Sequence, residues 1–116
     1  MEKTASRFVY FINKPPLKYG NQVLNGSVIT YIKVDGENIR TILNFKNGKL
    51  QSQWGSPAVQ CSDGHIEEWD EGLISNLKVD NFNQPYPAII TQGGRLKEYW
   101  IQGKMINKEI HDSEEQ

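Results

Sequence analysis

The sequence lacks several features that identify common classes of protein. Its 116 residues include a single cysteine, Cys61, which excludes an intrachain disulfide and a cysteine-rich zinc site and favours a reducing compartment. Basic and acidic residues nearly cancel, 13 against 14, whereas an obligate nucleic-acid-binding domain normally carries a basic excess. No apolar run approaches the roughly 18 residues of a transmembrane helix, and residues 1–6 are not followed by the apolar stretch of a signal peptide. We therefore expect one cytoplasmic domain over residues 1–116, without nucleic-acid binding or membrane insertion.

Helical periodicity is also scarce. The best helical candidate is residues 106–115, where a short helix and a frayed tail are the two alternatives. The chain instead has ten glycines, most of them in residue pairs that supply the positive φ angles of two-residue hairpin turns. These pairs are Asp35-Gly36, Asn47-Gly48, Asp63-Gly64, Gly93-Gly94 and Gln102-Gly103.

Short runs of β-branched and aromatic residues lie between these turns, and their length suits strands. They cover residues 7–12, 27–34, 38–45, 49–54, 58–61, 65–69, 73–79, 88–91 and 95–101. Folding the chain at the turns sets residues opposite one another in a defined register. The predicted pairs are Ile32 with Ile39, Tyr31 with Arg40, Phe45 with Leu50, Trp100 with Met105, and Tyr99 with Ile106. The sequence therefore predicts an all-β fold, an antiparallel meander of β-hairpins.

Part of the chain repeats itself. Residues 57–76 and 87–107 both open with Pro-Ala and align with one inserted residue, and a degenerate earlier unit begins at Ser27. We expect two to three degenerate repeats, over about residues 27–56, 57–86 and 87–108. Because of the insertion, Trp69 and Trp100 either face opposite sides of the sheet or are brought back into match by a bulge.

The repeated residues resemble the bacterial and viral MORN-like repeats. The resemblance is carried by Ser56-Pro57-Ala58-Val59, Asp63-Gly64, Glu68-Trp69 and Gly72, by Tyr86-Pro87-Ala88-Ile89, Gly93-Gly94, Glu98-Tyr99-Trp100 and Gln102-Gly103-Lys104, and by Asn47-Gly48-Lys49. The chain departs from the family where Ser56 and Tyr86 replace the glycine before Pro-Ala, and where no His-Arg follows Asn47-Gly48-Lys49. The resemblance implies a sheet of stacked hairpins that acts as a protein- or membrane-contacting scaffold, in some members antitoxin-like, and not as a catalyst.

Two groups of residues are candidates for binding a partner. Aromatic rings serve as anchors for a protein or a sugar when they are half-exposed, and as core when they are buried. This group contains Trp54, Trp69, Tyr86, Tyr99 and Trp100. Clustered acidic residues either steer a basic partner or are ordinary exposed charge. This second group contains Asp63, Glu67, Glu68, Asp70 and Glu71.

His65 and Cys61 are the candidates for catalysis. On a strand His65 shares a face with Glu67 and Trp69, which either places a base beside a carboxylate or forms a solvated face. The hairpin register predicts Ile66 opposite Cys61 and His65 diagonal to it, so that Cys61 is either a nucleophile or a small buried hydrophobic residue. The two histidines and the carboxylates show no ligand spacing, and we expect no metal and no cofactor.

The function that we expect is a small, non-catalytic protein–protein interaction module that binds a protein partner, or a second copy of itself through an edge strand. One version is an antitoxin-like or phage-encoded inhibitor of a host protein. One alternative is a carbohydrate-binding module that uses exposed Trp and Tyr rings. The other is a small enzyme around His65 and Cys61.

Overall fold

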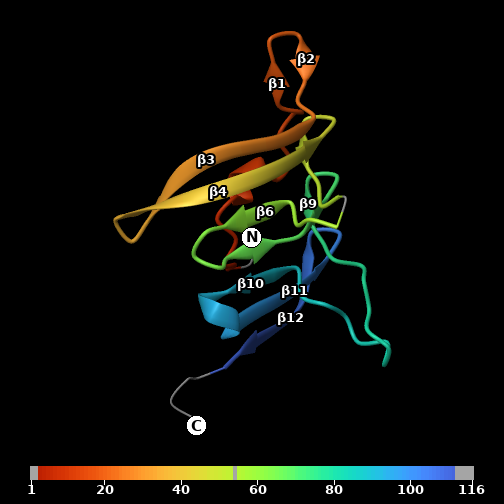
Figure 1. The fold of residues 1–116 in the computed structure, drawn as a ribbon. Helices are drawn as coiled ribbons and strands as arrows, with labels where there is room; N and C mark the ends of the chain where they lie inside the picture. Colours follow the sequence, from red (N-terminus) through yellow and green to blue (C-terminus); the bar gives the residue numbers. More distant parts are fainter. Residues whose placement is uncertain (1–2, 54, 112–116) are drawn as a thin grey trace.

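The computed structural model describes residues 3–53 and 55–111 (Figure 1). Its strands are β1 (Lys18–Tyr19), β2 (Gln22–Val23), β3 (Gly26–Val34), β4 (Glu37–Lys46), β5 (Lys49–Leu50), β6 (Val59–Cys61), β7 (Ile66–Glu67), β8 (Trp69–Asp70), β9 (Leu73–Ile74), β10 (Ile89–Thr91), β11 (Leu96–Ile101) and β12 (Lys104–Ile110). Two single 3₁₀ turns, η1 (Val9–Phe11) and η2 (Gln92–Gly94), are the helical elements of the described chain. The predicted all-β class is confirmed.

The main sheet is an antiparallel meander. Its strand order is β12-β11-β10-β7-β6-β4-β3, and β5 pairs with β4 beside this path. Two further hairpins, β1–β2 and β8–β9, stand apart from it as two-stranded sheets. The β3–β4 hairpin and the β11–β12 hairpin therefore form the two edges of the main sheet.

The two-residue turns set the registers that the sequence predicts. Asp35 and Asn47 adopt positive φ angles of 50° and 53°, followed by glycine, as a type I′ turn requires. The pairs Tyr31–Arg40, Ile32–Ile39, Phe45–Leu50 and Trp100–Met105 are confirmed. Glu71-Gly72 makes a further turn of this kind, with φ of 47° at Glu71, which the sequence analysis missed because glutamate is a rare residue at this position.

Two turns are longer than predicted, and they change the local register. Cys61 N–H donates to His65 O across a three-residue loop, so Ile66 pairs with Gln60 and the predicted pairing of Ile66 with Cys61 is wrong. The Gly93-Gly94 pair lies in a four-residue loop, because Thr91 pairs with Leu96. The inserted residue of the second repeat copy is thus absorbed in a loop, and Trp69 and Trp100 face the same way.

A β-bulge alters one further register. The pairing of β11 with β12 shifts between Tyr99 and Trp100, so that Tyr99 pairs with Asn107. The predicted pairing of Tyr99 with Ile106 is wrong by this one residue.

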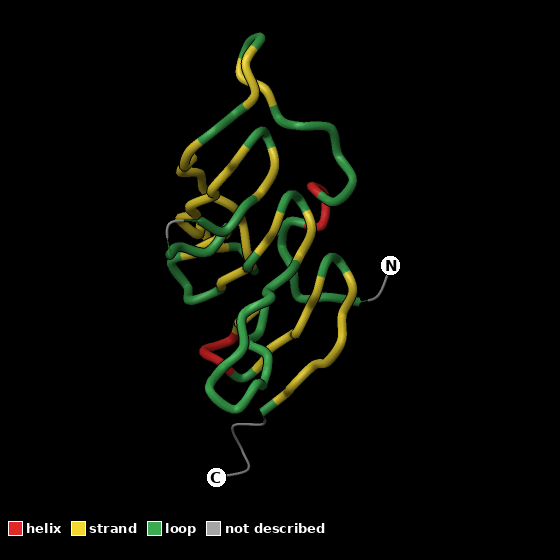
Figure 2. Tube along the Cα trace, turned by 90° about the vertical axis from the view of Figure 1, so that its right-hand side faces the viewer, coloured by secondary structure: helices red, strands yellow, loops and turns green. Residues whose placement is uncertain are grey.

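Successive repeat units stack through the same two contacts, a cross-strand side-chain pair and a backbone hydrogen bond, which together form the stacking joint. In each unit an aromatic residue pairs with an aliphatic one across a hairpin: Phe45 with Leu50, Trp69 with Ile74, and Trp100 with Met105. The turn glycine of each hairpin donates its N–H to the preceding unit: Gly48 to Leu24 O at 2.8 Å, Gly72 to Leu50 O at 3.0 Å, and Gly103 to Ile74 O at 2.8 Å. Stacking in one direction makes the molecule elongated, 52 × 36 × 28 Å, with β1–β2 and β12 toward opposite ends (Figures 1 and 2).

Both ends of the chain differ from the prediction. Residues 7–12 form no strand and contain η1, because Arg7 N–H bonds to the side chain of Glu67, while Phe11 N–H and Ile12 N–H bond to carbonyls of the run itself. For residues 106–115 both predicted alternatives, a short helix and a frayed tail, are wrong up to Ile110, because β12 pairs with β11 as far as that residue. Residues 112–116 lie outside the described residues.

Two predicted strands are also shorter than expected. In the runs 49–54 and 73–79 the strand covers only Lys49–Leu50 and Leu73–Ile74. The backbone leaves the hairpin after these residues and bonds to the next unit, as Ser52 N–H does to Trp69 O and Asn76 N–H to Trp100 O.

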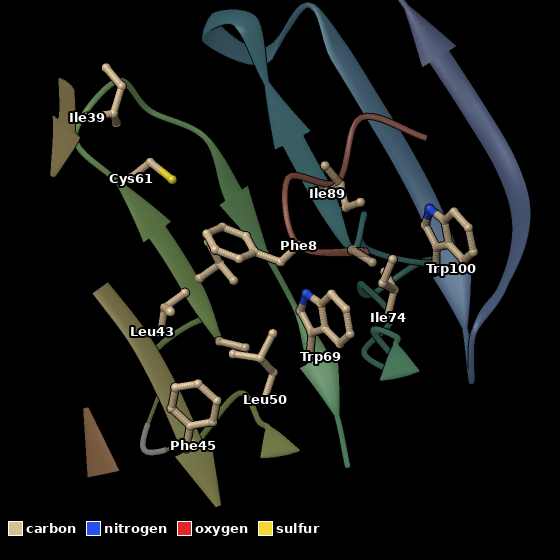
Figure 3. Packing of buried hydrophobic residues seen from close by; sticks show 13 residues of the cluster. Phe8, Ile39, Leu43, Phe45, Leu50, Cys61, Trp69, Ile74, Ile89 and Trp100 are labelled. Atoms are coloured by element: carbon tan, nitrogen blue, oxygen red, sulfur yellow. The ribbon is translucent and has the colours of Figure 1, made fainter. Parts of the chain in front are cut away.

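The hydrophobic core runs along one face of the sheet. It contains Phe8, Ile39, Leu43, Phe45, Leu50, Ala58, Val59, Cys61, Trp69, Ile74, Ala88, Ile89 and Trp100. Phe8 is the member that the N-terminal segment contributes, and Figure 3 shows its ring reaching into the middle of the cluster. The N-terminal segment therefore covers apolar surface that the strands alone leave open.

The close packing at the stacking joint predicts that alanine in place of two turn glycines, Gly48 and Gly36, costs different amounts of stability. A Cβ at Gly48 would lie 2.6 Å from Pro16 Cβ and 2.7 Å from Leu17 N, whereas a Cβ at Gly36 would meet nothing within 4 Å. Both residues have positive φ, which costs an alanine about 1–2 kcal/mol. Gly48→Ala should therefore lower the free energy of unfolding more than Gly36→Ala, as measured by urea denaturation. Equal losses for the two variants would contradict the close approach at Gly48.

Candidate protein-binding surface

Glu67, predicted as part of an acidic surface, is fully buried in β7. Its Oε1 accepts hydrogen bonds from Ser6 Oγ at 2.8 Å and from Trp69 Nε1 at 2.8 Å. Its Oε2 accepts from Arg7 N at 2.7 Å and lies 2.7 Å from His65 Nε2. A buried carboxylate is stable only when it is fully hydrogen-bonded, and here four donors surround it. The role of Glu67 is therefore to hold the N-terminal segment on the sheet.

Glu98 occupies the equivalent place in the next repeat and is also fully buried. It accepts hydrogen bonds from Thr4 Oγ1 at 2.6 Å, Ala5 N at 2.7 Å and Trp100 Nε1 at 2.9 Å. In both repeats one Glu thus binds a hydroxyl, the next backbone N–H, and the indole two residues further along the chain. Glu98 is not among the predicted site residues, although the Glu-x-Trp pattern that recurs at Glu67 and Glu98 is a visible signal for it.

His65 and Cys61 lie side by side in the fold but are both buried. His65 Nε2 contacts Glu67, and its Nδ1 has no hydrogen-bond partner among the described residues. Cys61 Sγ accepts a hydrogen bond from Thr41 Oγ1 at 3.5 Å. His65, Glu67 and Trp69 do share a face, as predicted, but that face is the core and not a solvated surface. A substrate has no access to either side chain in this conformation.

The remaining acidic residues do not form one surface. Asp63 is paired with Arg7 at 2.8 Å, and this guanidinium holds the pKa of the Asp63 carboxyl below its ordinary value. Asp70 accepts hydrogen bonds from Gln51 Nε2 at 3.0 Å and Gln102 Nε2 at 3.3 Å, which links three successive units. Glu71 is exposed in its turn, and Glu68 is partly buried. Two of these four residues, Asp63 and Asp70, therefore have structural partners within the fold.

The predicted aromatic anchors fall into two groups. Trp69, Tyr99 and Trp100 are buried, so their rings are core and not exposed platforms. Tyr86 is 47% exposed and is the described member of the set that a partner can reach. Trp54 lies outside the described residues.

A cleft of about 430 Å³ lies beside the second repeat, lined mainly by polar residues such as Gln51, Ser52 and Asn76. These groups already have partners: Gln51 Nε2 donates to Asp70, Ser52 Oγ accepts from Ala58 N, and Asn76 Nδ2 donates to Pro87 O. Trp69 lines the cleft but is fully buried. Several polar groups of the cleft are thus engaged within the fold, and its described lining offers a sugar no exposed ring for stacking.

One loop concentrates exposed apolar side chains. The 77–86 loop projects from the sheet between β9 and β10, at the right in Figure 1. It carries Leu77, Val79, Phe82 and Tyr86, and Phe82 is 83% exposed. No pattern in the sequence identified Phe82, because a lone Phe in a Pro- and Asn-rich stretch is equally consistent with an exposed and a buried side chain.

The backbone of the 77–86 loop is held in one conformation. Asp80 Oδ1 accepts hydrogen bonds from Phe82 N at 2.8 Å and Gln84 N at 2.9 Å, and Asp80 N donates to Gln84 O at 2.9 Å. Val79 forms a bridge with Pro85, and Tyr86 N donates to Lys78 O at 3.1 Å. The exposed rings are therefore presented on an ordered base, which lowers the entropy cost of binding.

A scan of family models finds none that matches this chain, and searches of curated proteins and of solved structures find no matching protein or structure. The MORN-like resemblance consequently stays a prediction that rests on the residues quoted above. Within the described residues, no helix has the length and apolar character needed to cross a membrane. The same residues contain no group of three or more His, Cys, Asp or Glu side chains placed to hold a metal ion.

The four donors around Glu67 predict that even an isosteric change is costly. Glu67→Gln keeps the shape but places an NH2 group where one oxygen was, so that either Trp69 Nε1–H or Arg7 N–H faces another donor and loses its acceptor, at about 1–3 kcal/mol. We expect the free energy of unfolding to fall by about 2 kcal/mol or more in urea denaturation. Glu68→Gln, next to it on the other face of the sheet, is the matched control and should change stability by less than about 0.5 kcal/mol. Similar small effects for both variants would contradict the role assigned to Glu67.

The burial and the hydrogen bond of Tyr99 predict that the protein loses stability in alkali. Burial, together with the hydrogen bond that its hydroxyl donates to Glu109, raises the pKa of Tyr99 from 10.0 to about 12. Because the folded state holds this proton more tightly, Tyr99 stabilises the protein fully below pH 10.0, and this contribution disappears as pH rises to about 12. The difference in urea midpoint between the wild type and Tyr99→Phe should therefore shrink over this range. Midpoints that fall in parallel would contradict the prediction.

Proposed function

We propose that this protein is a small protein-binding module that contacts its partner through the 77–86 loop. The observation that carries the proposal is the cluster of exposed apolar side chains, Leu77, Val79, Phe82 and Tyr86, on a loop whose backbone is fixed by Asp80. Exposed apolar side chains gathered in one place mark interaction sites. Aromatic side chains are also frequent among the residues that dominate binding energy.

The stacked hairpins supply the rigid base that such a loop needs. The 77–86 loop begins directly after β9 and ends before β10, and Asn76 Nδ2 bonds to Pro87 O at 3.0 Å across its base. The two ends of the loop are thus held together by the repeat itself. A small antitoxin-like inhibitor of another protein, the role that the MORN-like resemblance implies for some members of that family, is one form of this proposal.

The other two functions have less support. Carbohydrate binding needs exposed rings beside polar groups, and the ring among the described lining residues of the cleft, that of Trp69, is fully buried. Catalysis around His65 and Cys61 needs an open pocket, and both side chains are buried. A protein partner remains the proposal that the exposed side chains favour.

The test compares two exposed aromatic residues. Phe82→Ala removes the ring at the tip of the proposed contact, whereas Tyr19→Ala removes a ring that is 85% exposed in the β1–β2 hairpin. The wild type, immobilised, should retain a specific protein from a lysate of the native host. Phe82→Ala should bind that protein about tenfold more weakly or worse in a titration, and Tyr19→Ala should bind it like the wild type.

Both variants should unfold at the wild-type urea midpoint, since both side chains are exposed. Equal binding by Phe82→Ala and the wild type would overturn the assignment to the 77–86 loop.

A further inference from the structure

Strand β3 is a long edge strand with a free side. Its nine residues, Gly26–Val34, pair with β4 along their whole length without a bulge. It is the last strand of the main sheet, and no strand of the described chain pairs with its other side. Figure 1 shows the β3–β4 hairpin extending past the neighbouring strand β6.

The hairpin turn determines which backbone groups of β3 are free. Val34 and Glu37 flank the two-residue turn Asp35-Gly36, so they exchange hydrogen bonds with each other, and so does every second pair along the hairpin. The residues in between point their N–H and C=O groups away from β4. These residues are Ser27, Ile29, Tyr31 and Lys33.

The sequence of β3 is complementary to itself when two copies run antiparallel. With Thr30 opposite Thr30 of the second copy, Ile29 lies opposite Tyr31 and Val28 opposite Ile32, in both directions. Lys33 then lies opposite Ser27, so that no like charges face each other. All four outward-pointing residues fall at hydrogen-bonding positions in this register, which provides about eight new backbone hydrogen bonds.

The side chains on the exposed face fit this pairing. Ile29 is 55% exposed and Tyr31 is 63% exposed. A β-branched residue opposite an aromatic one is a favourable cross-strand pair, and the register forms it twice. On the other face Val28 and Ile32 are partly buried against the core, so pairing extends the apolar face of the sheet across the two copies.

The opposite edge of the sheet lacks these properties. Strand β12 carries three charged residues, Lys104, Lys108 and Glu109, and its pairing with β11 contains a bulge. Charged residues and bulges are the usual protection of an edge strand against pairing with another chain. In β3 the only charged residue is Lys33, and no bulge interrupts it.

We propose that the protein forms a symmetric dimer through antiparallel pairing of β3 with β3 of a second copy, centred on Thr30. The partner is another copy of this chain, because the register that satisfies the free backbone groups also pairs the side chains of β3 with one another. The interface is separate from the 77–86 loop and does not depend on the function proposed for that loop. Phe82→Ala should therefore leave the dimer intact.

Sedimentation velocity of the full chain over a series of micromolar concentrations tests the proposal. The wild type should shift from monomer to dimer, and Tyr19→Lys, in the β1–β2 hairpin, should behave in the same way. Ile29→Lys combined with Tyr31→Lys should remain monomeric, since each introduced lysine faces another one across the two-fold axis. Ile29→Lys combined with Tyr31→Glu should restore the dimer, because position 29 of one copy then faces the opposite charge at position 31 of the other.

A cross-link tests the register directly. Opposed residues at the two-fold axis form a non-hydrogen-bonded pair with Cα atoms about 4.5 Å apart, which a disulfide can span. Oxidised Thr30→Cys should therefore give a covalent dimer. Tyr31→Cys, whose position faces residue 29, should cross-link far less. A wild type that stays monomeric throughout the series, or a failure of the charge-paired variant to restore association, would overturn the proposal.

Discussion

Two buried carboxylates hold the molecule together. Glu67 and Glu98 lie in the core side of the sheet, where an ionic group without hydrogen-bond donors would cost several kcal/mol. Their hydrogen-bond partners are the Trp of the same repeat, His65 beside Glu67, and the N-terminal segment at Thr4–Arg7, roughly 60 to 90 residues away in sequence. This arrangement brings Phe8 over the core. The strands, the tryptophans and the N-terminal segment are therefore stable only together.

This dependence on partners that are distant in sequence separates the features that could be predicted from the sequence from those that could not. Hairpin registers next to Asp35-Gly36, Asn47-Gly48 and Gln102-Gly103 depend on the φ preferences of adjacent residues, and those predictions were correct, except that the bulge in β11–β12 moves Tyr99 from Ile106 to Asn107. The N-terminal segment was predicted as a strand because its apolar residues suit one. Arg7, the first residue of that predicted strand, instead donates its N–H to the side chain of Glu67 on a distant strand, an acceptor that no local pattern encodes. The two-residue turns predicted at Asp63-Gly64 and Gly93-Gly94 were wrong for a related reason, because a residue pair that favours a turn does not specify how many residues the loop contains.

The candidate site was predicted only in part. The aromatic set included Tyr86, which is exposed, but also Trp69 and Trp100, which are core. The indole N–H of each Trp needs an acceptor, and a Glu two residues earlier on the same face supplies it, so burial of both residues together could have been inferred. Phe82 could not have been identified in this way. Its exposure follows from hydrogen bonds of Asp80 that turn the loop away from the sheet.

The joint between successive hairpins has a consequence for the evolution of this architecture. The backbone carbonyls of Leu24, Leu50 and Ile74 each accept a hydrogen bond from the glycine of the next turn. Each unit therefore offers the following unit the same acceptor that its own turn glycine uses. The variable loops between Cys61 and His65 and between Thr91 and Leu96 lie away from that joint. Duplication of a unit would therefore lengthen the stack without disturbing its neighbours. Small insertions can likewise accumulate at the loops while the spacing of the core stays constant.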